Sequence, residues 1–300
     1  MRKAFAESML EMAEKDEKLV VLIGDISHHL LKDFEVCFPD RFYNVGICEQ
    51  SMIGMAAGLA MEGFRPVVHT IAPFCVERAY EQIKVDLCYQ NLDVTIVSVG
   101  GSFDYAHLGC THHCYEDVSI LRPLPNIDIF TPGTSKEFKT LFSQSWNNGR
   151  SKYFKLSKTE HKQNVDVSAY EYHVINEGSK KLIFVSGHLL QDVLHLNNYE
   201  ENTIVYCPTV EPISLTSQQT AVRLMKEHDS TLVIEENSTS GAIADKIFDI
   251  ASNNNVRTVI NKMGIPRQFC TAYGSVSDHR ENLGLTTQGI QNKINELKYV

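Results

Sequence analysis

The stretch at residues 41–63, RFYNVGICEQSMIGMAAGLAMEG, predicts a short strand that runs directly into a helix carrying Glu49 in its first turn. Glycines and alanines at residues 54–58 leave one surface of this helix without bulk, although each glycine costs about 1 kcal/mol of helix propensity. Such a cost is tolerated where another surface approaches closely. We therefore expect a neighbouring helix or a second subunit to pack on this ridge, GMAAG.

Apolar runs typical of strands alternate with helical periodicity from end to end, which predicts an α/β protein with two domains, each a mostly parallel sheet flanked by helices. The predicted strands are 19–24, 66–71, 93–100, 127–132 and 153–157, then 181–187, 203–208, 230–237 and 256–261. The predicted helices are 3–15, 49–62, 75–90, 115–121 and 135–147, then 188–196, 217–227, 240–252 and 287–298.

A polar segment without helical period separates the two series. It predicts a first domain at 1–160, a linker at 161–178 and a second domain at 179–300.

Composition excludes several classes of protein. The chain has 300 residues, of which 43% are hydrophobic and 22% charged, as in soluble globular proteins. Its net charge of -9 argues against a nucleic-acid partner. Its apolar runs are shorter than the roughly 20 residues of a membrane span, and its amino terminus is amphipathic rather than signal-like, so we expect a cytoplasmic protein with no membrane association. Cysteines scattered through apolar segments predict reduced and mostly buried thiols.

Candidate site residues follow the predicted strands of the first half. Asp25 ends the first strand, Phe74 opens the helix after the second, and a loop with several histidines follows the third. Ligands of open α/β sheets bind at this carboxyl edge. Simpler explanations compete with a site: Asp25 can cap a turn, Phe74 can pack in the core, and Arg78 can form ion pairs on a solvated helix face. A carboxylate such as Glu49 also stabilises a helix amino terminus by about 0.3–1 kcal/mol through the dipole.

The cysteines and histidines of the third segment do not predict a metal site. Four ligands crowded between Cys110 and Cys114 cannot close around one tetrahedral zinc ion. Nothing in the sequence pairs Cys110 with an imidazole as a nucleophile. The stretch VIEEN at 233–237 is interpreted as turn and packing chemistry.

Three segments in this order resemble the transketolase family, with its pyrimidine-binding domain followed by its carboxy-terminal domain. The resemblance is carried by FPDRFYNVGICEQ (38–50), FCVERAYEQI (74–83) and GCTHHCYEDVSILRPLPN (109–126). It continues through LVIEEN (232–237) and LGLTTQGI (283–290), so it covers nearly the whole chain.

The resemblance implies thiamine diphosphate as cofactor and gives roles to single residues. Glu49 takes the place of the catalytic glutamate that shares a proton with the aminopyrimidine, which requires a site without water. Phe74 matches the aromatic residue that stacks on this ring, and Asp25 and Arg78 are assigned to the cofactor. His112 matches a catalytic histidine that hydrogen-bonds the donor's oxygen.

The resemblance also predicts what this chain lacks. Relatives hold the diphosphate through a divalent metal at a GDG motif, and no GDG occurs here. The chain is therefore similar to the carboxy-terminal subunit of a split transketolase that binds no metal itself. A separate amino-terminal subunit is expected to bind the diphosphate and Mg²⁺, and homodimerisation through the pyrimidine-binding domain would give a heterotetramer of two plus two.

The substrate side departs from the family pattern. Lys158 falls where relatives place an arginine that holds a sugar phosphate, and a lysine makes a looser contact. Leu108 stands where relatives have an aspartate, and Gly100 where they often have a histidine. His28, His29, His107 and His113 are the residues expected to complete substrate binding.

The predicted function is transfer of a two-carbon ketol unit from a ketose, phosphorylated in the preferred interpretation, to an aldose. One alternative is the beta subunit of a 2-oxo acid dehydrogenase or decarboxylase, or an acyl-transferring thiamine enzyme. Those beta subunits lack the THH-x-x-ED-x-x-x-x-R pattern present at 111–122. The other alternative is a scaffold subunit without catalysis, which the intact Glu49, Phe74 and His112 disfavour.

Overall fold

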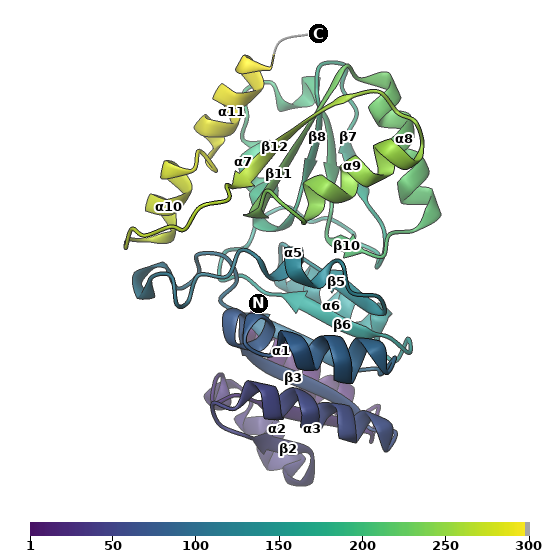
Figure 1. Cartoon of the computed structure of the whole chain (residues 1–300), viewed down its shortest axis with the longest axis vertical. Helices are drawn as coiled ribbons and strands as arrows, with labels where there is room; N and C mark the ends of the chain where they lie inside the picture. The colour runs from purple at the N-terminus through teal and green to yellow at the C-terminus, as the bar shows by residue number, and fades with distance from the viewer. Residues whose placement is uncertain (298–300) are drawn as a thin grey trace.

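The computed structural model describes residues 1–297 and contains two sheets, one in each half of the molecule (Figure 1). The predicted last helix and second domain extend to 298 and 300, so their ends lie outside the described residues. The first sheet has the order β10-β5-β6-β4-β3-β1-β2 and the second β12-β11-β8-β9-β7. All pairings are parallel except those of β10 with β5 and of β7 with β9. The prediction of an α/β protein with two mostly parallel sheets is confirmed.

Helices cover both faces of the first sheet, so its central strands are buried on both sides, as their continuous apolar runs predict. Every residue of β1 and β4 is buried. The strands are β1 (Leu19–Ile23), β2 (Phe42–Asn44), β3 (Arg65–Ile71), β4 (Thr95–Val99), β5 (Ile127–Phe130), β6 (Ser151–Lys155) and β10 (Thr209–Glu211). The α-helices are α1 (Arg2–Ala13), α2 (Lys32–Cys37), α3 (Glu49–Met61), α4 (Tyr80–Gln82), α5 (Asp117–Leu121) and α6 (Ser135–Ser145).

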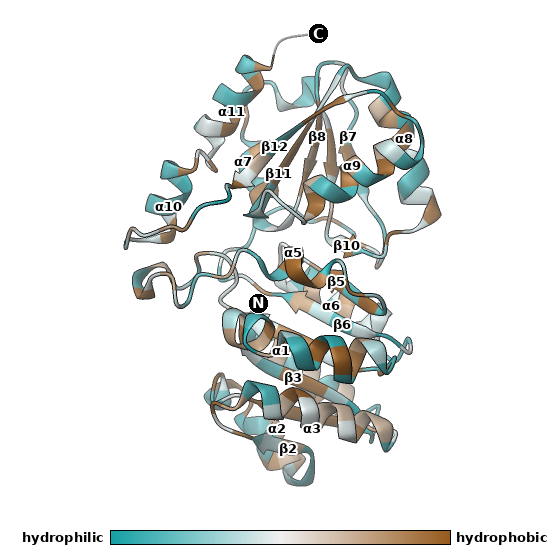
Figure 2. Cartoon of the chain, viewed as in Figure 1, coloured by the Kyte–Doolittle hydropathy of each residue, from teal (hydrophilic) through white to brown (hydrophobic). Residues whose placement is uncertain are grey.

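The second sheet repeats this arrangement, with buried hydrophobic strands beneath amphipathic helices (Figure 2). Its strands are β7 (His173–Asn176), β8 (Leu182–Val185), β9 (Thr203–Tyr206), β11 (Ser230–Ser238) and β12 (Val259–Ile265). Its α-helices are α7 (Leu190–Leu194), α8 (Leu215–Glu227), α9 (Ile243–Asn253), α10 (Val276–Asn282) and α11 (Thr287–Glu296). Side chains of Ser214, Ser275 and Thr286 cap the starts of α8, α10 and α11, which fixes where these helices begin.

Several elements differ from the sequence prediction. The single helix predicted at 75–90 consists of the π-helix η3 (Pro73–Glu77), the short α4 and a second π-helix, η4 (Ile83–Tyr89). The last strand lies at Val259–Ile265 rather than 256–261. It is an edge strand with mixed exposure, so hydrophobicity marks its bounds poorly.

The two halves are joined by more than a linker. No helix or strand occurs at residues 156–172, but β7 lies within the predicted linker and already belongs to the second sheet. Strand β10 comes from the second half of the chain and pairs with β5 of the first sheet. The linker bounds at 161–178 therefore stay a prediction.

The small-residue ridge of α3 is covered on one side only within residues 1–297. Ala56 and Ala57 are buried, and α3 packs against β3 and η4. A Cβ added at Gly58 would meet no atom within 4 Å, and one at Gly54 would meet only an Asp86 carboxylate oxygen at 4.0 Å. Met55 on the same helix is 45% exposed. The expected neighbouring helix is thus η4 on the buried side of α3, while a second subunit stays the expected occupant of the open side with Gly58 and Met55.

All eight cysteines are free thiols. Cys37, Cys48 and Cys110 are exposed and Cys270 is partly buried, so only half of the thiols are buried and the prediction of mostly buried thiols was too strong. No helix within residues 1–297 is both long and apolar enough to cross a lipid bilayer.

Candidate functional site

The predicted site residues gather at one edge of the first sheet. Strands β2, β1, β3, β4 and β6 are neighbours in a parallel arrangement, so their carboxyl ends lie side by side. Segments leaving these ends carry Asp25, Glu49, Phe74, His112 and Lys158. A shared edge of this kind is where ligands of α/β sheets bind.

Four of these side chains form a connected group, the Glu49–His112 group, which consists of Glu49, Arg78, Phe74 and His112. The Glu49 side chain is only 1% exposed, and its Oε2 accepts a hydrogen bond of 2.7 Å from Arg78 Nη1. The Arg78 guanidinium carbon lies 4.3 Å from the centroid of the Phe74 ring. The ring of His112 meets Phe74 edge-on at 5.1 Å. The structure thus unites a buried carboxylate, a cation, an aromatic face and an imidazole.

The π-helix η3 sets this arrangement. Its wider turn is closed by a bond of 3.1 Å from the Arg78 N–H to the Pro73 carbonyl, five residues earlier. Cys75 and Val76 are buried, whereas Phe74 and Arg78 are partly exposed toward the sheet edge. π-helical turns are rare and frequently occur at functional sites. Burial, and then the nearby Glu49 charge, raises the pKa of the Cys75 thiol far above its usual range, so this thiol is inert.

The loop between β4 and α5 presents His112 to the group and accounts for one departure from the family pattern. Gly100 has φ +74°, and a Cβ there would lie 2.2 Å from the Tyr105 ring. Tyr105 therefore fills the space that a side chain at position 100 would need. The ring centroids of His112 and Tyr105 lie 6.1 Å apart. Burial, together with the nearby His107, lowers the pKa of His112, so its imidazole is neutral near pH 7. His107 is exposed beside Tyr105.

His113 points elsewhere. Its side chain is buried, with its ring 5.1 Å from Phe103 and 5.1 Å from His279 of the second half. Its Nε2 lies 3.4 Å from the Ala106 carbonyl. This geometry favours a packing role between the two halves, and the structure does not bring His113 together with Glu49.

Asp25, His28 and His29 line a cleft of about 650 Å³ that they share with Arg2 and residues nearby. Asp25 has φ 54° and exchanges two hydrogen bonds of 3.1 Å with the Asn44 side chain, so it also caps its turn. His28 lies 3.0 Å from Glu35 and is exposed to solvent.

Lys158 lines a neighbouring cavity of about 280 Å³ together with Arg2 and Lys3. Arg2 therefore belongs to both hollows, and its Nε and Nη2 donate to Ser27 Oγ at 3.1 and 2.8 Å. Arg2 was missed by the sequence analysis, although an arginine at the start of the first helix could have signalled it. Together these cations make the rim of the site suited to an anion.

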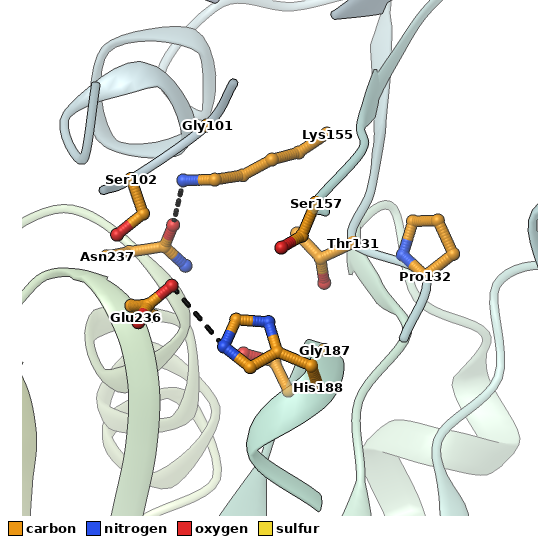
Figure 3. Close-up of a pocket in the computed structure, with 11 residues that line it drawn as sticks. Gly101, Ser102, Thr131, Pro132, Lys155, Ser157, Gly187, His188, Glu236 and Asn237 are labelled. Carbon is orange, nitrogen blue, oxygen red and sulfur yellow. Dashed lines mark hydrogen bonds and ion pairs between the residues drawn. The ribbon is translucent and has the colours of Figure 1, made fainter. Parts of the chain in front are cut away.

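A buried polar seam joins the two halves next to this edge (Figure 3). Lys155 Nζ donates to Asp117 Oδ1 at 2.8 Å and to Asn237 Oδ1 at 2.6 Å. Glu235 accepts hydrogen bonds from the first N–H groups of α9, while Glu236 lies 3.4 Å from His188. The stretch VIEEN, interpreted above as turn and packing chemistry, thus caps a helix and ties the second half to the first. The cavity between these side chains, about 40 Å³, has room for a few waters.

No group of three or more His, Cys, Asp or Glu side chains within residues 1–297 converges in a way that could hold a metal ion.

Comparison with known proteins adds the family. Residues 1–164 match the profile of "Transketolase, pyrimidine binding domain". The chain is 32% identical to the "Uncharacterized 33.6 kDa protein in fasciation locus" of Rhodococcoides fascians, over 98% of this chain and 94% of that protein. It is 27% identical to one of the subunits of an apulose-4-phosphate transketolase from Actinobacillus succinogenes, over 95% of this chain and 94% of that protein.

Two further likenesses concern length and fold. The "1-deoxy-D-xylulose-5-phosphate synthase" of Haemophilus influenzae is 28% identical over 97% of this chain, which spans only 47% of that protein. The solved structure "Split gene transketolase, inactive beta4 tetramer" superposes with a TM-score of 0.85 at 24% identity, over 98% of this chain and 96% of that one.

Proposed function

The chain belongs to the transketolase family, whose pyrimidine-binding domain it carries, and on this premise we propose that it is one subunit of a thiamine diphosphate enzyme that transfers a two-carbon ketol unit from a phosphorylated ketose to an aldose. The observation that carries the proposal is the Glu49–His112 group at the carboxyl edge of the first sheet. The four residues come from three separate segments, which the parallel strands bring to one edge of the sheet.

The side chains present fit an aminopyrimidine ring. Glu49 is shielded from water, which lets its carboxyl share a proton with a ring nitrogen. Phe74 offers a partly exposed aromatic face for stacking. When bound, thiamine diphosphate supplies the nucleophilic carbon that cleaves the bond next to the ketose carbonyl. The Arg78 guanidinium contacts both the Glu49 carboxylate and the Phe74 ring. It must therefore move aside, or share Glu49 with the cofactor, when the cofactor binds.

His112 is assigned to the substrate oxygen. Its imidazole stands at the edge of Phe74, on the loop that borders the site. Because its pKa is lowered, the neutral ring can donate a hydrogen bond from one nitrogen and accept one at the other. His112 thus holds or moves a proton at the oxygen where charge develops.

A phosphorylated donor is supported by the cations at the rim. Arg2, Lys3 and Lys158 line one cavity, and Arg2 extends to the cleft of His28 and His29. An arginine and a lysine acting on one phosphate would combine a planar two-point contact with a point charge. His28, His29 and the exposed His107 are assigned to the sugar hydroxyls, with Asp25 between sugar and cofactor.

A partner subunit is expected to bind the diphosphate and its divalent ion. This chain matches nearly the full length of a relative named as a subunit, and about half the length of the synthase from Haemophilus influenzae. The open side of α3, with Gly58 open and Met55 exposed, is the proposed contact with a second copy of this chain. Two copies and two partner subunits would complete a heterotetramer in the cytoplasm.

One observation favours a second candidate, acyl transfer from a 2-oxo acid. Leu108 is apolar and 42% exposed at the loop where relatives recognise a donor hydroxyl, and the chain is also similar to a 1-deoxy-D-xylulose-5-phosphate synthase. Pyruvate consumption with an aldose phosphate, in the absence of any ketose donor, would support this candidate over ketol transfer.

The test is reconstitution. The chain is purified with a candidate diphosphate-binding subunit, supplied with Mg²⁺ and thiamine diphosphate, and assayed for ketol transfer by coupled oxidation of NADH. Transfer that requires both subunits is expected. A partner equally active without this chain would establish a scaffold role and overturn the proposal.

A further inference from the structure

Asp104 is a buried carboxylate that none of the roles above uses. It lies in the loop after β4 and is 7% exposed. Its Oδ1 accepts a hydrogen bond of 3.1 Å from Ser157 Oγ, and its Oδ2 accepts one of 2.9 Å from the Lys158 backbone N–H. Its own backbone carbonyl accepts a bond of 2.8 Å from Lys158 Nζ. Asp104 therefore contacts both the backbone N–H and the ammonium group of Lys158.

This double contact gives Lys158 a fixed direction. A lysine side chain is a flexible stem with a compact charge and ordinarily makes loose anion contacts. Here the ammonium also lies 3.8 Å from the centroid of the Tyr105 ring, which limits it further. Tyr105 in turn neighbours His112. The contacts of Asp104 and Tyr105 thus fix the position of the Lys158 ammonium relative to His112, the proposed catalytic histidine.

The second half of the chain acts on Asp104 as well. Burial and the charge of Glu236 raise the pKa of Asp104 to about 6, against the lowering effects of the Lys158 N–H, His188 and Ser157. Glu236 is itself paired with His188 at 3.4 Å and with Arg280 at 3.3 Å. Charged groups that line the adjoining cavity with Asp104 are Arg2, Lys3 and Lys158, together with the residue Met1 at the amino terminus.

We propose that Asp104 is a positioning residue that directs Lys158 toward the substrate's phosphate. The inference rests on the proposed function, because it takes Lys158 as a phosphate ligand. Asp104 is given no contact of its own with substrate or cofactor, because both of its carboxylate oxygens accept hydrogen bonds from Ser157 and Lys158. Protonation of Asp104 removes the negative charge that faces the Lys158 N–H, so the contact weakens in acid.

The experiment compares Asp104→Asn with wild type in the reconstituted complex, using a phosphorylated ketose and its unphosphorylated counterpart between pH 5 and 8. At pH 7.5 we expect the KM for the phosphorylated donor to rise about tenfold and kcat to change less than about threefold, the signature of lost binding rather than lost chemistry. The KM for the unphosphorylated donor stays constant. Asp229→Asn, an exposed aspartate on the opposite half, is the matched control.

The pH profile separates positioning from a merely structural role. Below about pH 6 wild-type Asp104 is neutral, as the asparagine is. The tenfold difference in KM for the phosphorylated donor between wild type and Asp104→Asn should therefore disappear there. The substrate phosphate also ionises near pH 6, but it affects both proteins equally. Glu236→Gln removes a negative charge that raises the pKa of Asp104. The pH at which the KM of the two proteins becomes equal should therefore be lower in this background. A gap that persists unchanged at pH 5 overturns the proposal.

Two more variants keep the result interpretable. If Lys158→Met leaves the KM for the phosphorylated donor unchanged, the phosphate contact of the proposed function is wrong. If Lys158→Met raises it and Asp104→Asn does not, the positioning role is wrong while the proposed function stands. Should Asp104→Asn fail to fold, Ser157→Ala removes one of the same bonds, and an unchanged KM ratio in that variant overturns the inference.

Discussion

Glu49→Gln should separate catalysis from folding. The substitution keeps the shape of the side chain and an oxygen that can still accept from Arg78 Nη1, now 2.7 Å away. Glu49 is 1% exposed, so a neutral amide is no harder to bury than the carboxylate. Arg78 is 38% exposed and can be rehydrated once its partner loses charge. We expect the free energy of unfolding to change by less than about 1 kcal/mol.

Turnover should respond far more strongly. An amide cannot take up the proton that the cofactor ring shares with Glu49, and general acid–base groups contribute roughly 10²- to 10⁴-fold. The reconstituted complex carrying Glu49→Gln should therefore lose at least about 100-fold in turnover, a barrier increase of about 2.7 kcal/mol.

The assay is coupled ketol transfer at saturating cofactor, with urea unfolding measured on the same preparations. Glu62→Gln, an exposed glutamate at the end of the same helix, serves as control and should match wild type in both measurements. Turnover within about tenfold of wild type, or a loss that tracks unfolding, would refute the cofactor role of Glu49.

Three further predictions concern stability. Lys155→Met leaves the fully buried Asp117 without its cation and should lower the free energy of unfolding by about 3–5 kcal/mol. Adding Asp117→Asn should restore much of this loss. A loss below about 1 kcal/mol in urea unfolding would show that the buried ion pair between Lys155 and Asp117 does not stabilise the protein. Partial desolvation and then the nearby Glu116 charge raise the pKa of Glu77 from 4.5 to about 7, although this side chain keeps contact with solvent. The unfolded chain therefore releases this proton first, and stability should fall as pH rises from 4.5 to 7. Glu77→Gln should flatten this part of the urea-derived profile, and an unaltered slope would show the carboxyl to be ionised throughout. Gly100→Ala puts a side chain at φ +74° with its Cβ 2.2 Å from the Tyr105 ring, which should lower the free energy of unfolding by about 1–3 kcal/mol. A melting temperature equal to that of wild type would mean that this loop repacks freely.

Sequence reasoning reached the edge of the site but not its contacts. Parallel strands bring their carboxyl ends together, so apolar runs sufficed to predict Asp25 and Phe74 at one edge. Glu49 was predicted only at the start of a helix, and its role came from the family resemblance. The bridge from Arg78 to both Glu49 and Phe74 depends on the extra residue per turn of the π-helix, which no periodicity of 3.6 predicts. The neighbouring histidines His112 and His113 diverge for a similar reason, because the turn of an irregular loop sends one to the site and the other inward.

The seam between the two halves was also beyond the sequence. Asn237 and Lys155 lie far apart along the chain, and their pairing follows from how the second sheet sits on the first. Strand β10 is three residues long and crosses to the first sheet, so its hydrophobic pattern carries too little signal to assign it. Arg2 was missed because an arginine near a chain end is ordinarily a solvated charge.

The central claim is that this chain supplies an acid and an aromatic face for a cofactor whose diphosphate is held by another subunit. Isothermal titration of thiamine diphosphate tests it most directly, with the isolated chain and with the two-subunit complex, each with and without Mg²⁺. The account predicts no Mg²⁺-dependent binding by the isolated chain and tight, Mg²⁺-dependent binding by the complex. Tight Mg²⁺-dependent binding by the chain alone, or none by the complex, would contradict it.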